Sequence, residues 1–195
     1  MKTVQTTMSD DPRQGENTRR GEDARLRAAI AGDAAAYDSL LAPLLDPAYR
    51  LATVVLRDRT DAEDAVQEAA IKAWSRLHQF RGPVESLRAW FLGIVMNECR
   101  MARRRPFWSV LRLASLEQAE ASAEDVAIRS ADLGRAIANL GLDDRAALFA
   151  HFYLDLPLEE SAKLLGLSLG AAKSRIYRAA RRLRPGVEMQ EVMNR

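Results

Sequence analysis

The sequence of 195 residues predicts an all-α fold, with two small helical domains joined by a flexible linker. Apolar residues recur at helical spacing along most of the chain, no segment alternates like a strand, and the last long segment has the layout of a helix-turn-helix. We place the domains at residues 23–105 and 126–186, with a disordered tail at 1–22, the linker at 106–125 and a C-terminal tail at 187–195.

Composition limits the possible functions. Charged residues make up 29% of the chain but the net charge is only +2, so any affinity for nucleic acid must come from local basic surfaces. The single cysteine, Cys99, excludes an internal disulfide and suits a reducing cytosol. We find neither a signal-peptide pattern at the N-terminus nor the roughly 18–20 uninterrupted apolar residues of a membrane span. A cytoplasmic protein without a membrane span is expected.

The first domain should begin with a helix from Glu22, and a second helix should follow Gly32 and Asp33. Pro47 is expected to start a third helix, since proline is tolerated in a first turn. A polar break at residues 57–60 ends this run of apolar residues.

Thr60 or Asp61 is expected to cap the next helix, whose first turn carries acidic side chains that the helix dipole favours. This helix should end near Leu77 and be followed by a loop at residues 79–83. Ser86 then begins the last helix of this domain.

Between the domains, residues 107–123 mix aromatic, aliphatic and small polar residues without a sustained period, which is typical of a linker. Helical spacing resumes near Val126 and stops at Gly141. Asp143 and its acidic neighbour then open a helix that continues through Tyr153.

The C-terminal segment predicts a helix-turn-helix. A short amphipathic helix at residues 158–165 ends at Gly166, which can adopt a left-handed conformation without a Cβ clash. Ser168 can cap a second helix by accepting a hydrogen bond from its free amides. That second helix carries no acidic residue, as expected of a helix that enters the major groove of DNA. Its basic side chains are Lys173, Arg175, Arg178, Arg181, Arg182 and Arg184.

The helix after Ser86 combines aromatic and basic residues. Trp90 and Phe91 lie in its first half, and a basic cluster that includes Arg100 ends it. Exposed rings can stack on bases while guanidinium groups hold phosphates, so this combination suits nucleic acid. The alternative is that the rings belong to the core and the arginines form a solvated helix end favoured by the dipole.

Two motifs resemble a known family. The first is DAEDAVQEA from Asp61, followed by AW at 73–74, FRG at 80–82 and LRAWF at 87–91, and it resembles region 2 of bacterial RNA polymerase sigma factors. The second is LEESAKLLGLSLGAAKSRIYRA from Leu158, which is similar to region 4. The short two-domain chain resembles in particular the extracytoplasmic-function (ECF) group of the sigma-70 family.

The resemblance implies a transcription initiation factor that binds core RNA polymerase and directs it to promoters by recognising −10 and −35 elements and assisting melting. Such a protein is not an enzyme, uses no cofactor or metal, and engages polymerase as a monomer. Factors of this kind are commonly held by an anti-sigma factor, so such a partner is expected here as well.

Three sets of residues match working positions of the family. The acidic start of one helix implies contact with the clamp helices of core polymerase and comprises Asp61, Glu63, Asp64, Gln67 and Glu68, with ordinary first-turn charge as the alternative. The candidates for reading and melting the −10 element are Phe80, Arg81, Arg88, Trp90, Asn97, Arg100, Arg103 and Arg104. The candidates for the −35 element are Ser168, Lys173, Ser174, Arg175, Tyr177, Arg178 and Arg181.

Within the last set Arg175 suits either a phosphate contact or packing. Ala171 and Ala172 stand where the family often has a threonine and a β-branched residue, which leaves the promoter sequence open.

Two other classes remain open. A self-sufficient regulator with a LuxR-like helix-turn-helix would bind duplex DNA without polymerase, usually as a dimer. A helical adaptor protein would show no salt-sensitive affinity for DNA. An enzyme fits least, because no catalytic constellation is present and His78, Cys99 and His151 lack the spacing of metal ligands.

Overall fold

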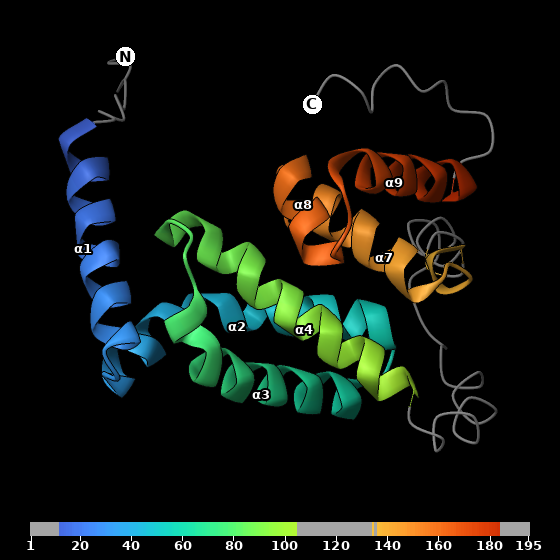
Figure 1. The fold of residues 1–195 in the computed structure, drawn as a ribbon. Helices are drawn as coiled ribbons and strands as arrows, with labels where there is room; N and C mark the ends of the chain where they lie inside the picture. The colour runs from blue at the N-terminus through green and yellow to red at the C-terminus, as the bar shows by residue number, and fades with distance from the viewer. Residues whose placement is uncertain (1–11, 105–133, 135, 184–195) are drawn as a thin grey trace, which may run out of the picture.

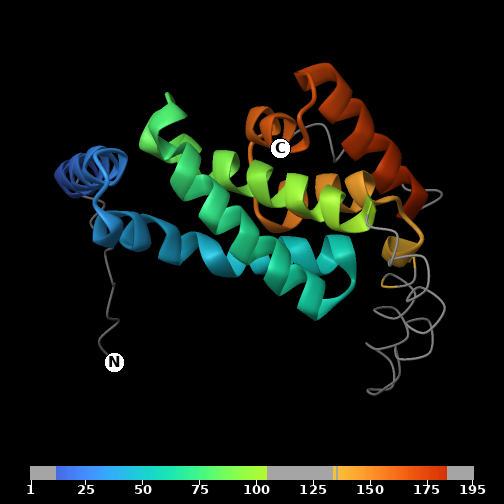
Figure 2. The same ribbon diagram turned by 60° about the horizontal axis from the view of Figure 1, so that its bottom comes forward.

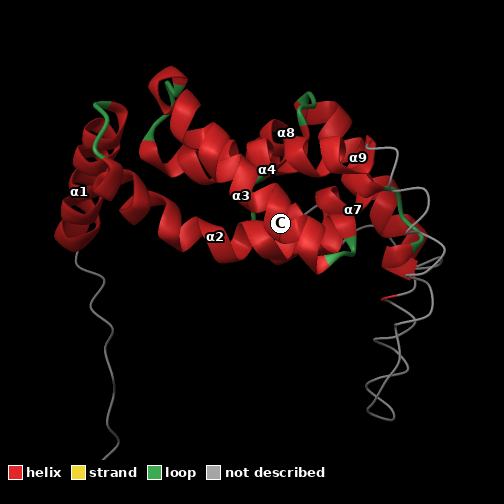
Figure 3. Ribbon diagram, turned by 90° about the horizontal axis from the view of Figure 1, so that it is seen from below, coloured by secondary structure: helices red, strands yellow, loops and turns green. Residues whose placement is uncertain are grey.

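The computed structural model describes residues 12–104, 134 and 136–183 as an assembly of helices (Figure 1). No strand occurs among these residues and Figure 3 shows only helices and short loops, so the all-α class is confirmed. The predicted linker and the C-terminal tail lie outside the described residues. The first domain contains α1 (Pro12–Ile30), α2 (Ala34–Leu56), α3 (Arg59–Arg76), the 3-10 turns η1 (Leu77–Gln79) and η2 (Val84–Ser86), and α4 (Leu87–Arg104). The second contains α7 (Leu142–Leu148), the π-helix η4 (Phe149–Tyr153), α8 (Leu158–Leu165) and α9 (Leu169–Leu183).

Helix α1 begins at Pro12 rather than near Glu22, so residues 12–22, predicted as part of a disordered tail, are helical. Arg19 of this helix lies 3.5 Å from the carboxylate of Glu85, and Leu26 is buried. Contacts with the rest of the domain therefore support a polar segment in which the sequence shows no apolar periodicity.

Helix α2 is continuous, although the sequence predicts a new helix at Pro47. Pro43 and Pro47 both lie inside it, where a proline lacks the amide that would donate to the preceding turn. Burial of the same helix offsets this loss, since Leu51 and Val55 are 0% exposed. Packing therefore overrides the local effect of both prolines.

Helix α2 also meets the length and mean hydropathy (1.3 over its most apolar window) of a membrane span. The sequence reasoning expected no such segment. Ala48 and Leu51 are nevertheless fully buried against the bundle, while Asp46 and Arg50 form an ion pair on the exposed side. The helix is thus accounted for as a core helix of this fold.

The cap of α3 is Asp58, not Thr60 or Asp61 as predicted. Its carboxylate accepts a hydrogen bond from the amide of Asp61 at 2.9 Å, which satisfies one of the free amides of the first turn. All three residue types are good caps, so sequence alone does not distinguish positions this close together.

Small side chains bring α3 against its neighbours. Ala62, Ala65, Ala69 and Ala73 are buried and follow helical spacing along one face. Figures 1 and 2 show α2, α3 and α4 lying side by side as the body of the first domain. The opposite face of α3 is left to solvent.

The second domain contains the predicted helix-turn-helix. Gly166 ends α8 with a φ of +68°, which confirms the reason for a glycine at this turn. The hydroxyl of Ser168 accepts a hydrogen bond from the amide of Ala171 at 3.3 Å, at the start of α9. Ser168 therefore acts as the predicted cap.

The two domains pack against each other, which the sequence does not predict. Leu92 of α4 and Leu164 of α8 belong to one continuous cluster of buried residues that spans both domains. Where the two helices approach, a Cβ on Gly93 would lie 3.8 Å from the Cα of Leu164. The helices therefore come close on the face of α4 that carries several of the −10 candidates.

Candidate nucleic-acid and polymerase interfaces

The exposed face of α9 is basic. Ala172, Ile176 and Ala179 anchor its other face in the core. Of the −35 candidates, Ser168, Lys173, Ser174, Arg178 and Arg181 are exposed, whereas Arg175 and Tyr177 are partly buried. A helix that buries one face and presents cations on the other can lie in a groove of DNA.

Arg175 is held inside its own domain. Its guanidinium lies 3.1 Å from the carboxylate of Asp143 and 4.0 Å from that of Asp144, both at the start of α7. Arg182 also pairs with Asp144, at 3.2 Å. Of the two roles expected for Arg175, this geometry favours packing, because its charge is already compensated.

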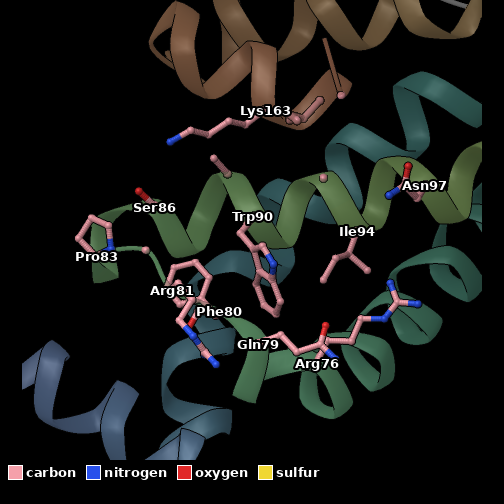
Figure 4. A pocket seen from close by; sticks show the side chains of 15 residues that line it. Arg76, Gln79, Phe80, Arg81, Pro83, Ser86, Trp90, Ile94, Asn97 and Lys163 are labelled. Carbon is pink, nitrogen blue, oxygen red and sulfur yellow. The ribbon is translucent and has the colours of Figure 1, made fainter. Parts of the chain in front are cut away.

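The loop before α4 forms one wall of an open pocket of about 580 Å³ (Figure 4). Phe80 and Trp90 lie side by side in it, with ring centroids 5.3 Å apart. A Cβ on Gly82 would lie 3.0 Å from the Phe80 ring, so only glycine leaves that ring in place. Asn97 lines the same pocket and is exposed, while Lys163 of α8 lines it from the other domain.

The remaining −10 candidates are not equally available. Arg81 is exposed and donates to the carbonyl oxygens of His78 and Phe80. Arg104 is exposed and Arg103 is partly buried.

Arg88 and Arg100, in contrast, both reach the second domain. Arg88 donates to the carbonyl oxygen of Leu154 at 3.0 Å. Arg100 donates to the carbonyl of Leu165 at 2.9 Å and to the carboxylate of Asp143 at 3.0 Å. These two −10 candidates therefore reach across the domain interface, and Arg100 also donates to the side-chain oxygen of Asn97 on its own helix at 3.0 Å.

The outer face of α3 is acidic and partly apolar. Glu63, Asp64, Gln67 and Glu68 are exposed, whereas Asp61 is partly buried at the capped end of the helix. The sequence reasoning missed two neighbours on this helix: Ile71 is 65% exposed and Trp74 is 38% exposed. They lie one and two turns beyond Gln67, so helical spacing places them on the same face of α3 as this candidate, a signal that the sequence already contains. An exposed apolar edge beside carboxylates is typical of a protein-binding surface.

A second exposed aromatic group lies at η4. Phe152 and Tyr153 are 47% and 53% exposed, and the Tyr153 ring stacks on Phe149 with centroids 4.4 Å apart. The Tyr153 hydroxyl accepts a hydrogen bond from Arg50 of α2 at 2.6 Å. Sequence analysis placed these rings in a helix but did not identify them as surface residues.

Within the described residues no group of three or more His, Cys, Asp and Glu side chains gathers at one point. Cys99 is buried, and burial raises the pKa of its thiol to about 12, so the reactive thiolate is scarce at neutral pH.

The fold and these surfaces define a class: a two-domain helical protein whose second domain carries a helix-turn-helix of the DNA-binding type. Comparison with protein families specifies it further. The model of sigma-70 region 2 matches residues 40–108 and the model of sigma-70 region 4 matches residues 130–183. The ECF RNA polymerase sigma factor SigM of Mycobacterium tuberculosis is 32% identical over 167 residues, which cover 83% of this chain and 82% of SigM.

Two solved structures are similar in fold. CnrH in complex with the cytosolic domain of CnrY is 26% identical, with a TM-score of 0.60 over 83% of this chain and 94% of CnrH. The sigma factor RpoE of Bartonella quintana, in complex with the anti-sigma factor NepR, is 24% identical, with a TM-score of 0.60 over 82% of this chain and 98% of RpoE.

The chain belongs to the ECF sigma factors of the sigma-70 family. It is therefore a transcription initiation factor that directs RNA polymerase to promoters. The members of this family are not known as enzymes. The resemblance drawn from the two motifs is confirmed.

Proposed function

We propose that this sigma factor uses three separate surfaces: the exposed face of α9 for the −35 element, the Phe80–Trp90 pocket with α4 for the −10 element, and the outer face of α3 for core polymerase. The observation that carries the proposal is the division of α9 into a buried apolar face and an exposed basic face. These two faces alone are compatible with any DNA-binding helix, and the family match specifies the −35 element.

At the −35 element, the exposed side chains early in α9 would reach base edges, and Arg178 and Arg181 further along the helix would contact phosphates. Lys173 and Arg178 suit this role because both are exposed and no carboxylate among the described residues pairs with them. Arg175 would instead hold α9 on α7.

At the −10 element, the pocket offers two adjacent rings and a neutral amide. Trp90, which is partly buried, would supply the stacking surface, with Phe80, only 7% exposed, packed against it. Asn97 can both donate to and accept from a base edge. Extruding a base costs a few kcal/mol, which such a pocket and its stacking partners would offset.

On α3, four exposed acidic or amide side chains and the adjoining Ile71 and Trp74 would bind the polymerase. Carboxylates would steer the encounter with a basic partner, and the two apolar side chains would supply burial.

An anti-sigma factor would hold the protein inactive in the cytoplasm, as partners of that kind accompany RpoE in its solved complex. Release would allow the protein to join polymerase as a monomer.

The test is run-off transcription with purified core RNA polymerase on templates with randomised −35 and −10 elements. We expect transcripts from one selected promoter class, lost when Lys173 and Arg178 are replaced by alanine. Arg182→Ala is the matched control, because Arg182 is paired with Asp144 and should leave the transcripts largely intact. Tight DNA binding without any effect on core polymerase would contradict the proposal and favour a stand-alone regulator.

A further inference from the structure

One carboxylate connects the two DNA-reading domains. Asp143, in the first turn of α7, places Oδ1 3.0 Å from Arg100 of α4 and Oδ2 3.1 Å from Arg175 of α9. The three side chains are 38%, 25% and 27% exposed, so they are partly shielded from water. Asp143 therefore ties an arginine beside the proposed −10 pocket to an arginine of the −35 helix.

Other contacts hold the same arrangement. Arg88 and Arg100 donate to the backbone carbonyls of Leu154 and Leu165, which close α8 and the segment before it onto α4. Helix α8 approaches α4 at Gly93, and Lys163 reaches the pocket that Phe80 and Trp90 line. In this arrangement the second domain covers part of the surface proposed for the −10 element.

We infer that this is a closed state in which the second domain blocks its own chain's −10 surface, with Asp143 as a carboxylate latch that must release Arg100 before DNA can use it. The inference rests on the proposed role of α4 in −10 binding. Phosphate and the Asp143 carboxylate compete for the same guanidinium, so −10 binding and domain closure exclude each other.

The energetic consequence follows from the competition. When the binding-competent state is only a fraction of the population, the apparent dissociation constant rises by the inverse of that fraction. A partly exposed ion pair is weak enough to open without a large input, which suits a reversible latch. Weakening it should raise affinity for −10 DNA without changing any residue that touches DNA.

The experiment compares Asp143→Asn with Asp144→Asn in the full chain. Asp144 is the matched control because it carries the same charge in the same helical turn, yet its ion pairs, to Arg175 and Arg182, stay within the second domain. The probe is a single-stranded −10 oligonucleotide of the selected promoter, with binding measured by fluorescence anisotropy. We expect Asp143→Asn to tighten binding by roughly two- to fivefold and Asp144→Asn to leave it unchanged.

A second readout needs no DNA. Spin labels at Ala42→Cys on α2 and Ala171→Cys on α9, both exposed positions, report the distance between the domains. Cys99 can stay, because it is fully buried and should not react with the label. The parent protein should give one short distance, and Asp143→Asn should add a longer one that Asp144→Asn lacks.

The outcomes separate the two proposals. If no variant binds the oligonucleotide, the −10 proposal fails and the label distances still decide the latch. Equal distances in the two variants would overturn the latch, whatever the DNA affinity. A longer distance in Asp143→Asn without tighter binding would show that closure does not cover the −10 surface, and would also overturn the inference.

Discussion

The guanidinium of Arg145 lies 2.6 Å from the carbonyl oxygen of Val55, so a side chain of the second domain closes the end of a helix in the first. Val55 sits in the last turn of α2, where the final carbonyls have no partner within the helix. A cation at this end also interacts favourably with the helix dipole. Arg145 is only 3% exposed and donates as well to the carbonyl of Ala138, at 3.3 Å.

Arg145→Met should therefore lower the free energy of unfolding by roughly 1–3 kcal/mol, because methionine fills similar space but leaves buried carbonyls without a donor. Urea unfolding followed by circular dichroism measures the change. Arg182→Met is the control: Arg182 is well exposed, so its loss should change stability by no more than about 0.5 kcal/mol. Equal effects of the two substitutions would show that the contact between Arg145 and Val55 contributes little.

Alanine substitutions at two glycines of the helix-turn-helix should change the free energy of unfolding in opposite directions. Gly166 has a φ of +68°, so Gly166→Ala should cost about 1–2 kcal/mol although no atom obstructs the new Cβ. Gly170 lies within α9, also with open space around it, and Gly170→Ala should gain about 0.5–1 kcal/mol. Thermal and urea unfolding of both variants tests the pair, and a gain at Gly166 would contradict the strain argument.

Tyr37 predicts a specific loss of stability in alkali. Burial raises its pKa to about 12 from an ordinary value of 10.0, and its hydroxyl donates to the carbonyl of Ala70 at 2.6 Å. The unfolded phenol therefore ionises first as the pH rises, and stability present below pH 10.0 is lost progressively up to about pH 12.

Across that interval the parent protein should lose roughly 1–2 kcal/mol more than Tyr37→Phe, which has no proton to lose. Urea unfolding at a series of pH values measures both proteins. The phenylalanine variant should start about 1 kcal/mol lower at neutral pH because the hydrogen bond is missing. Parallel curves for the two proteins would show that Tyr37 does not titrate in this way.

The sequence supports the helices, the helix-turn-helix and the family, because these depend on local periodicity and on motifs of adjacent residues. The turn at Gly166 and the cap at Ser168 follow from residue chemistry alone and are both observed. The continuous α2 is different: local rules end a helix at Pro47, whereas long-range burial carries it through.

The packing of one domain on the other could not be predicted for the same reason. From the sequence, Arg88 and Arg100 are expected to bind DNA. Their contacts with Leu154 and Leu165 join segments far apart in the chain, and no local pattern predicts such contacts. Arg175 was expected at a phosphate or in packing, and only its distance to Asp143 separates these roles. Which side chains touch DNA stays a prediction.

The salt dependence of DNA binding distinguishes side chains that contact phosphates from side chains that pack within the domain. Each phosphate that a protein neutralises contributes about 0.9 to the slope of log affinity against log salt concentration on duplex DNA. Arg178 is exposed and donates to the carbonyl of Ser174, and no carboxylate in the described part of the chain pairs with it. Arg178→Ala should reduce the slope by about one unit when the polymerase holoenzyme binds a −35 duplex.

Arg175→Ala is the matched comparison, since it removes the same charge from the same helix. Because Asp143 and Asp144 already compensate Arg175 within the domain, its loss should change the slope much less while lowering the stability of the second domain. Affinity measured between about 50 and 200 mM salt covers the informative range. A reduction of the slope by Arg175→Ala as large as that by Arg178→Ala would place Arg175 on the phosphates, and would mean that its ion pairs open when DNA binds.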